Sequence, residues 1–186
     1  MALAYALTTW PHLKAFLHRS LDDDLLADQL IDAATLKIEN YLGFPIVART
    51  FTEKHLGGCR NICLDTYPVV SVSSIADDQD VPATVSASDY VVIGNEGRLE
   101  YIYGSWPRPF HRWTITFDAG VFSNTQSVSE DYRQACHFVV ADILGDPQSP
   151  VTGESSNSRN IQYAHLDKPL PMQAVALLPA PRARVA

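Results

Sequence analysis

The stretch DDDLLADQLIDAATLKIENYLGFP, residues 22–45, decides the fold because it predicts one long helix and the point where that helix ends. Its three aspartates suit the positive end of a helix. Apolar residues then recur at intervals of four, which predicts a single apolar stripe. The stripe comprises Leu26, Leu30, Ala34 and Ile38. Gly43 can adopt the left-handed conformation that ends a helix and Pro45 cannot continue one, so we expect the helix to end at Leu42.

A shorter helix is predicted on each side of this long helix. The first lies within residues 10–19, and its apolar residues at helical spacing are Leu13, Phe16 and Leu17. The other opens at Ser127-Val128-Ser129-Glu130, which has the form of a capping box, and ends at Gly145. Its apolar face comprises Ala135, Cys136, Val139, Val140, Ile143 and Leu144. Helices are therefore expected over 10–42 and 128–145.

Between these helical stretches, residues 46–120 follow the two-residue period of strands. Residues 47, 49, 51, 53 and 55 are predicted to face one side, and 50, 52 and 54 the other. Further strands are expected at 61–65, 69–76, 83–86, 90–93, 98–103 and 112–118. Gly94-Asn95-Glu96-Gly97 offers a hairpin turn. Such close spacing favours antiparallel pairing.

These patterns together predict an α+β fold, a small helical bundle with an inserted antiparallel β subdomain and an extended C-terminal tail. At 186 residues the chain is long enough for one domain with a full core, since folding at this size buries roughly 70% of the unfolded surface. We expect a single domain over 1–169 and a tail over 170–186. Residues 146–160 are interpreted as a loop, followed by a short strand at 161–164.

Composition and charge argue against several classes of function. The net charge of −7 argues against general binding of nucleic acid through phosphate neutralisation. Cys59, Cys63 and Cys136 cannot all pair within one chain, and we interpret them as free thiols. No second cluster of Cys or His accompanies Cys59 and Cys63 at ligand spacing, so no metal and no cofactor are expected. Neither a secretory signal nor a membrane span is recognised, and we expect a protein that is soluble and cytosolic when made.

Catalysis has no supporting motif. His137 lies inside the last predicted helix with no nucleophile and third group in a recognisable pattern, and we interpret it as a buried or interface side chain. Trp106, Trp113 and Tyr101 are compatible with a ligand-binding aromatic surface, but aromatic residues on strands more often pack a sheet. The sequence therefore predicts a protein that is not an enzyme.

The order of the short motifs resembles the head-tail connector, or adaptor, proteins of long-tailed double-stranded DNA phages and gene transfer agents. The long helix ends in Tyr41-Leu42-Gly43-Phe44-Pro45, a strand opens with Tyr67-Pro68-Val69, and an aromatic strand runs from Trp113 into Ala119-Gly120. The tail continues the resemblance with Leu170-Pro171, Leu177-Leu178, Pro181 and Arg182. Two features depart from the family pattern: Leu144-Gly145-Asp146 stands where a basic residue is common, and the loop that follows is long.

The resemblance implies a structural subunit of the virion, assembled in the host cytoplasm and located at the head-tail junction. There it would form a ring, a dodecamer, below the portal protein, extending the DNA channel and joining capsid to tail. Its partners would be the portal and a downstream neck or tail-completion protein, and DNA would pass through without sequence-specific binding. The resemblance implies no contact with a membrane.

The tail is the candidate portal-docking segment. The residues expected to dock are Leu170, Met172, Val175, Leu177, Leu178 and Arg182. Packing of the tail against its own domain is the rival interpretation. For the whole chain, the alternatives are another neck or tail-completion protein, and a small cytosolic ligand-binding or enzymatic domain that uses His111 or His137.

Overall fold

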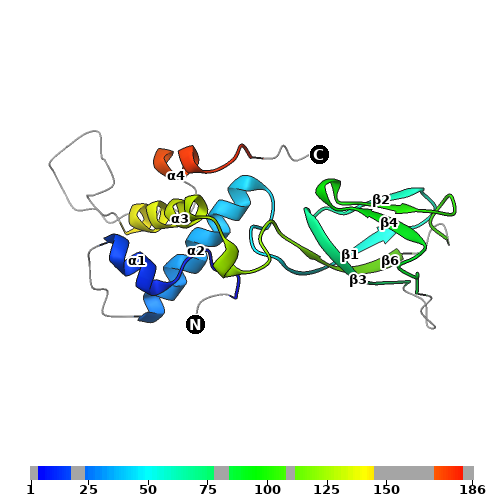
Figure 1. Cartoon of the computed structure of the whole chain (residues 1–186), viewed down its shortest axis with the longest axis horizontal. Helices are drawn as coiled ribbons and strands as arrows, with labels where there is room; N and C mark the ends of the chain where they lie inside the picture. The colour runs from blue at the N-terminus through cyan, green and yellow to red at the C-terminus, as the bar shows by residue number, and fades with distance from the viewer. Residues whose placement is uncertain (1–3, 18–23, 78–83, 108–111, 145–169, 182–186) are drawn as a thin grey trace. The chain divides into compact units, whose positions relative to one another are not determined.

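A computed structural model of the chain describes residues 4–17, 24–77, 84–107, 112–144 and 170–181 (Figure 1). The chain divides into two compact units. The helical unit combines Met1–Gly43 with Thr125–Ala186, and the β unit is Phe44–Asn124. The α+β class and the insertion of the β part between helices are thus confirmed. The predicted loop at 146–160 and strand at 161–164 lie outside the described residues.

The helical unit contains α1 (Trp10–Leu17), α2 (Asp24–Leu42), α3 (Glu130–Ile143) and α4 (Met172–Leu177). Helix α3 contacts each of the other three, and α1 also contacts α2. The N-terminal segment completes this core, because Leu7 is fully buried and its N–H donates to Thr35 Oγ1 at 3.2 Å. Among the described residues, no helix combines the length and the apolar character needed to span a membrane.

Helix α2 ends as predicted, and Ala34 and Ile38 are buried as predicted, but the first half of the buried stripe is shifted by one residue. Gly43 has a φ of 78°, and its N–H donates to Glu39 O at 2.8 Å. The buried apolar residues are Ala27, Ile31, Ala34, Ile38 and Leu42. The prediction that Leu26 and Leu30 share this stripe is wrong, because Leu26 is 44% exposed and Leu30 is half-buried. A row at constant intervals of four drifts around a helix of 3.6 residues per turn, so the buried line includes one interval of three among intervals of four.

Helix α3 has the predicted apolar face but a later start. Ser129 is its N-cap, in extended conformation, and no side-chain cap bond forms there. Thr125–Ser127 instead form a 3-10 turn, so the predicted capping box is wrong. Helix α3 begins at Glu130, and two acidic residues occupy its first turn. Its buried residues are Ala135, Cys136, His137, Val139, Val140 and Ala141.

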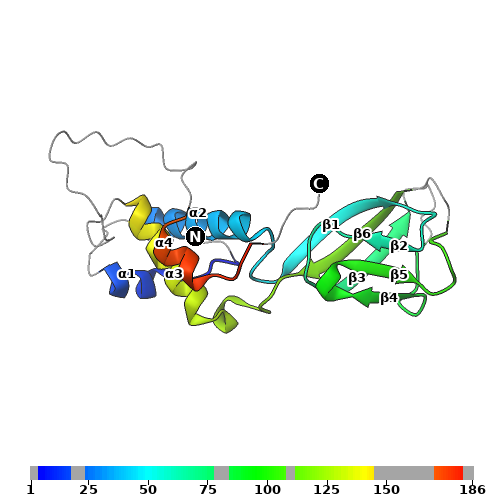
Figure 2. The same cartoon turned by 90° about the horizontal axis from the view of Figure 1, so that it is seen from above.

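Within its described residues, the β unit has six strands in two three-stranded sheets (Figure 2). The strands are β1 (Arg49–Leu56), β2 (Asn61–Cys63), β3 (Val69–Asp77), β4 (Tyr90–Ile93), β5 (Arg98–Tyr101) and β6 (Arg112–Ala119). Their orders are β1-β6-β3 and β2-β5-β4, and every strand pair is antiparallel, as predicted. Strand β1 alternates half-buried and exposed residues in the predicted phase. The predicted strand at 83–86 is reduced to one bridge between Ala76 and Thr84.

Aromatic and aliphatic residues of both sheets form one core in the β unit. Its largest fully buried members are Trp106, Trp113 and Phe117. Trp106 contacts Tyr90, Tyr101 and Trp113 at ring-centroid distances of 5.9, 5.3 and 6.3 Å. The aromatic residues therefore pack the sheets. The turn Gly94–Glu96 joins β4 to β5 at the predicted hairpin, and a Cβ at Gly94 would lie 2.3 Å from Val69 O.

Candidate assembly surfaces

The C-terminal segment packs on its own helical unit. Leu170, Ala174 and Leu178 are spaced by four residues and are all buried, with 7%, 0% and 9% of their surfaces exposed. Helices α3 and α4 form the most extensive helix–helix contact of the unit. A helix of six residues is too short to be stable by itself, so this contact holds α4 in place.

The opposite side of the same segment is apolar and exposed. Met172 is 87% exposed, the largest value among the large hydrophobic residues that the structure describes, and Ala176 is exposed one turn later. Val175 and Leu177 are half-buried. Of the six predicted docking residues, two therefore pack inward, three reach the surface at least partly, and Arg182 lies outside the described residues. The segment has an inner face that attaches it and an outer face that is accessible to a partner.

The buried polar groups of the helical unit have structural roles. His137 Nε2 lies 2.9 Å from Thr8 Oγ1, and the His137 ring packs 5.1 Å from the ring of Phe16. Burial lowers the pKa of His137 to about 4, so the ring is neutral at pH 7. Burial also raises the pKa of the Cys136 thiol to about 12, which keeps it protonated and therefore poorly nucleophilic. His137 is a buried side chain, as predicted.

One group in the β unit has the composition of a metal site. Ligand atoms of Glu53, His55 and Asp65 lie within 4.8 Å of one another. Glu53 Oε2, however, accepts from the Asp65 N–H and lies 2.9 Å from His55 Nε2, and Glu53 Oε1 accepts from the Thr66 N–H at 3.0 Å. Burial alone would raise the pKa of Glu53, but the His55 bond and the two N–H donors outweigh it and lower the pKa. The carboxylate is thus a clip that fixes the segment after β2 to β1.

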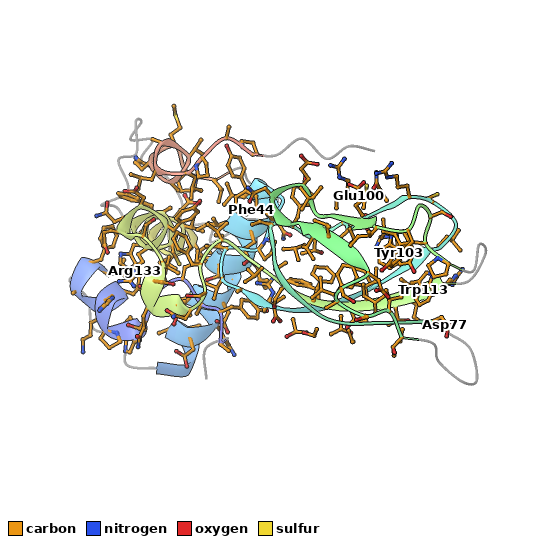
Figure 3. All side chains as sticks on the ribbon, turned by 45° about the vertical axis from the view of Figure 1, so that its right-hand side comes forward. Phe44, Asp77, Glu100, Tyr103, Trp113 and Arg133 are labelled. Carbon is orange, nitrogen blue, oxygen red and sulfur yellow. The ribbon has the colours of Figure 1, made fainter. Side chains whose placement is uncertain are left out.

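An exposed apolar tip lies at one end of the β unit. Leu56, Ile102 and Tyr103 are 59%, 53% and 72% exposed. Their two loops are joined, because the Gly58 N–H donates to Trp106 O at 3.0 Å and the Trp106 N–H donates to Cys59 O at 2.8 Å. Tyr103 is seen near the end of the β unit in Figure 3. Sequence reasoning missed this tip because it extended the strand to residue 103, whereas β5 ends at Tyr101.

The described residues thus include two exposed apolar surfaces, the outer side of α4 and the tip of the β unit. The chain matches the family model described as Head completion protein over residues 7–178. This range includes every described helix and strand, and the chain belongs to the head completion protein family. Completing a head is a structural task, and the resemblance to the head-tail connector family is confirmed.

Solved structures share the fold. One is a chain titled "Neck of native GTA particle computed with C12 symmetry", with a TM-score of 0.64, 17% identity, and coverage of 100% of this chain and 96% of that one. A second is titled "Neck of empty GTA particle computed with C6 symmetry". Its TM-score is 0.63 and its identity 18%, and the match covers 89% of this chain and 90% of that one. A third is titled "Virion of native gene transfer agent (GTA) particle". Its TM-score is 0.65 and its identity 14%, and the match covers 100% of this chain and 96% of that one. No curated protein sequence matches the chain.

Proposed function

We propose that this chain is a ring-forming subunit of the neck, located at the head-tail junction of a virion below the portal. The ring is a dodecamer that extends the DNA channel and joins the portal to the next neck protein. Membership in the head completion family supports the proposal, as does the shared fold with chains from neck structures, one of them computed with C12 symmetry. The net charge of −7 suits a passage that DNA crosses without being held.

The observation that carries the portal contact is the two-sided C-terminal segment. Leu170, Ala174 and Leu178 hold α4 on α3, while Met172 is displayed at 87% exposure. An apolar helix face of this kind fits a hydrophobic groove on a partner. Each copy contributes only a small apolar area, but a ring presents the same contact many times, so the combined affinity is much higher. We infer that Met172, Val175, Leu177 and Arg182 contact the portal.

Electron microscopy of the purified chain, alone and mixed with portal protein, tests the ring. We expect rings that stack coaxially on the portal. Met172→Asp tests the docking contact, because the side chain is almost fully exposed and its replacement leaves the inner face intact. We expect this variant to fold normally and to lose portal binding at least tenfold, whereas Val70→Asp, at an exposed position of the β unit, retains it. Unchanged portal binding by Met172→Asp and by a chain lacking residues 170–186 would refute the docking assignment.

A further inference from the structure

Three side chains that can bind a metal ion meet where β1 lies beside the segment after β2. Glu53 and His55 are two residues apart on β1, so they lie on the same side of the strand. Asp65 follows β2, and one ligand atom of each residue lies within 4.8 Å of the others. We call this group the Glu53 cluster. Sequence spacing did not indicate it, because 12 positions separate Glu53 from Asp65 and only folding brings them together.

The Glu53 cluster has an excess of negative charge. It contains two carboxylates, and among the described residues no lysine or arginine pairs with either of them. The side chain of Asp65 is exposed and has no hydrogen-bond partner in the described part of the chain. The Glu53 side chain is only 14% exposed, so water screens it incompletely from the second carboxylate. A divalent cation would balance both charges.

Glu53 is already oriented as a metal ligand would be. Its Oε2 accepts from the Asp65 N–H at 2.9 Å, and its Oε1 accepts from the Thr66 N–H at 3.0 Å. Carboxylates that bind metals are commonly held by hydrogen bonds of this kind. The two main-chain donors fix the Glu53 carboxylate, whereas the exposed Asp65 side chain is able to rotate toward it.

The separations within the Glu53 cluster are close to those around one ion. The ligand atoms of a tetrahedral Zn²⁺ are about 3.3 Å apart. His55 Nε2 lies 2.9 Å from Glu53 Oε2, so this pair needs only a small opening. The widest separation in the cluster is at most 4.8 Å, and rotation of the Asp65 side chain would close it.

We propose that Glu53, His55 and Asp65 bind a divalent transition-metal ion of the Zn²⁺ type, with water in the remaining position. One imidazole and two carboxylates are a ligand set for Zn²⁺, whereas Mg²⁺ and Ca²⁺ take oxygen ligands. The ion replaces the proton between His55 Nε2 and Glu53 Oε2, and the ring carries its remaining proton on Nδ1. It joins β1 to the segment after β2, where the Glu53 carboxylate already joins them. The site lies within one chain, so the inference goes beyond the proposed ring and does not depend on it.

Calorimetric titration with Zn²⁺ tests the site in the full-length chain. Cys59→Ser and Cys63→Ser are introduced first, because these two thiols are exposed and thiolates also bind Zn²⁺. We expect one ion to bind per chain. Because an ion that binds only the folded chain stabilises it, the melting temperature should rise by at least about 4 °C at saturating Zn²⁺ and return to its starting value with EDTA.

Two substitutions remove one ligand each and keep the hydrogen bonds of Glu53. Asp65→Asn retains the main-chain N–H that donates to Glu53, and His55→Gln retains a side-chain N–H donor. Each should weaken Zn²⁺ binding at least tenfold. Asp118→Asn is the matched control, because the Asp118 carboxylate accepts from the Thr50 hydroxyl, on the other side of β1. It should leave the affinity for Zn²⁺ unchanged.

Three results would overturn the metal site. They are the absence of Zn²⁺ binding by the parent chain, binding that neither Asp65→Asn nor His55→Gln weakens, and equal stabilisation by Mg²⁺. Each of them would leave the ring proposal in place, because none of these measurements depends on assembly. A ring that fails to form would in turn leave the metal site in place.

Discussion

Thr8 Oγ1 lies 2.9 Å from His137 Nε2, although 129 positions separate the two residues in the sequence. The bond is buried, and it joins the segment before α1 to the middle of α3. The segment before α1 is therefore hydrogen-bonded to α3, the first long helix that follows the inserted β unit in the sequence. A polar pair buried in this way contributes to stability only while both partners remain in place.

Loss of the Thr8 hydroxyl should destabilise the helical unit. Thr8→Val keeps the shape of the side chain but leaves His137 without this partner, and the expected cost is about 1–2 kcal/mol. Thermal unfolding followed by helical circular dichroism measures it. Thr52→Val, on the exposed face of β1, is the control and should change the helical transition very little. Equal effects of the two substitutions would show that the buried bond does not stabilise the fold.

Acidification should weaken the helical unit between about pH 6.5 and pH 4. The unfolded chain takes up a proton on His137 near its usual pKa of 6.5, whereas burial lowers the pKa to about 4 in the folded chain. The stabilisation is therefore complete above pH 6.5 and is lost as the pH falls through this window. Glu130 opposes the shift, and His12 and Arg133 add to it. Urea unfolding should show that the free energy of unfolding falls by roughly 1–2 kcal/mol over this window. In the His137→Gln variant this fall should be smaller. A pH dependence unaffected by that substitution would contradict the assignment.

The Glu53 carboxylate should matter far more than a carboxylate on the surface of the same unit. Glu53→Gln leaves one oxygen to accept from the Asp65 and Thr66 N–H groups, and we expect a loss of about 1–3 kcal/mol from the β unit. Glu100→Gln disrupts only the ion pair with Arg60, whose side chain is 70% exposed, and should cost less than about 1 kcal/mol. Tryptophan fluorescence during denaturation reports on this unit.

The stability that Glu53 contributes should also depend on pH. Because the pKa of Glu53 is lowered, its contribution should be present above pH 4.5 and be lost as the pH falls below that value.

Two alanines of α4 provide a matched test of its attachment. Ala174 is fully buried, and Ala176, in the same helix, is exposed. Ala174→Asp places a charge in the contact with α3 and should release the segment at a cost of at least about 2 kcal/mol, whereas Ala176→Asp should be tolerated. Hydrogen exchange over residues 170–181 measures the release. Fast exchange in the parent chain would show that α4 is not held on α3.

Local signals predicted most of the elements, and long-range packing decided the rest. The end of α2 followed from Gly43 and the phase of β1 from its alternation, because both are properties of neighbouring residues. The shift from Leu26 to Ala27 in the buried line arose because a row at constant intervals of four does not keep to one side of a helix with 3.6 residues per turn. Helix α4 had too few residues for a helical period to show. The Thr8–His137 bond and the Glu53 clip join residues whose proximity only the folded chain creates.

The hydrogen bonds at the base of the β unit have a consequence for how such proteins diverge. Ile46 O accepts from both Val121 and Phe122 at 3.0 and 2.9 Å, and the Ala48 N–H donates to Phe122 O at 2.7 Å. The incoming and outgoing chains are therefore fastened together before the strands begin. Because the β unit leaves and re-enters the helical unit at one place, its length can change without altering the path of the chain through the helical unit. The β unit can thus differ in size between related proteins while the helices keep their order in the sequence.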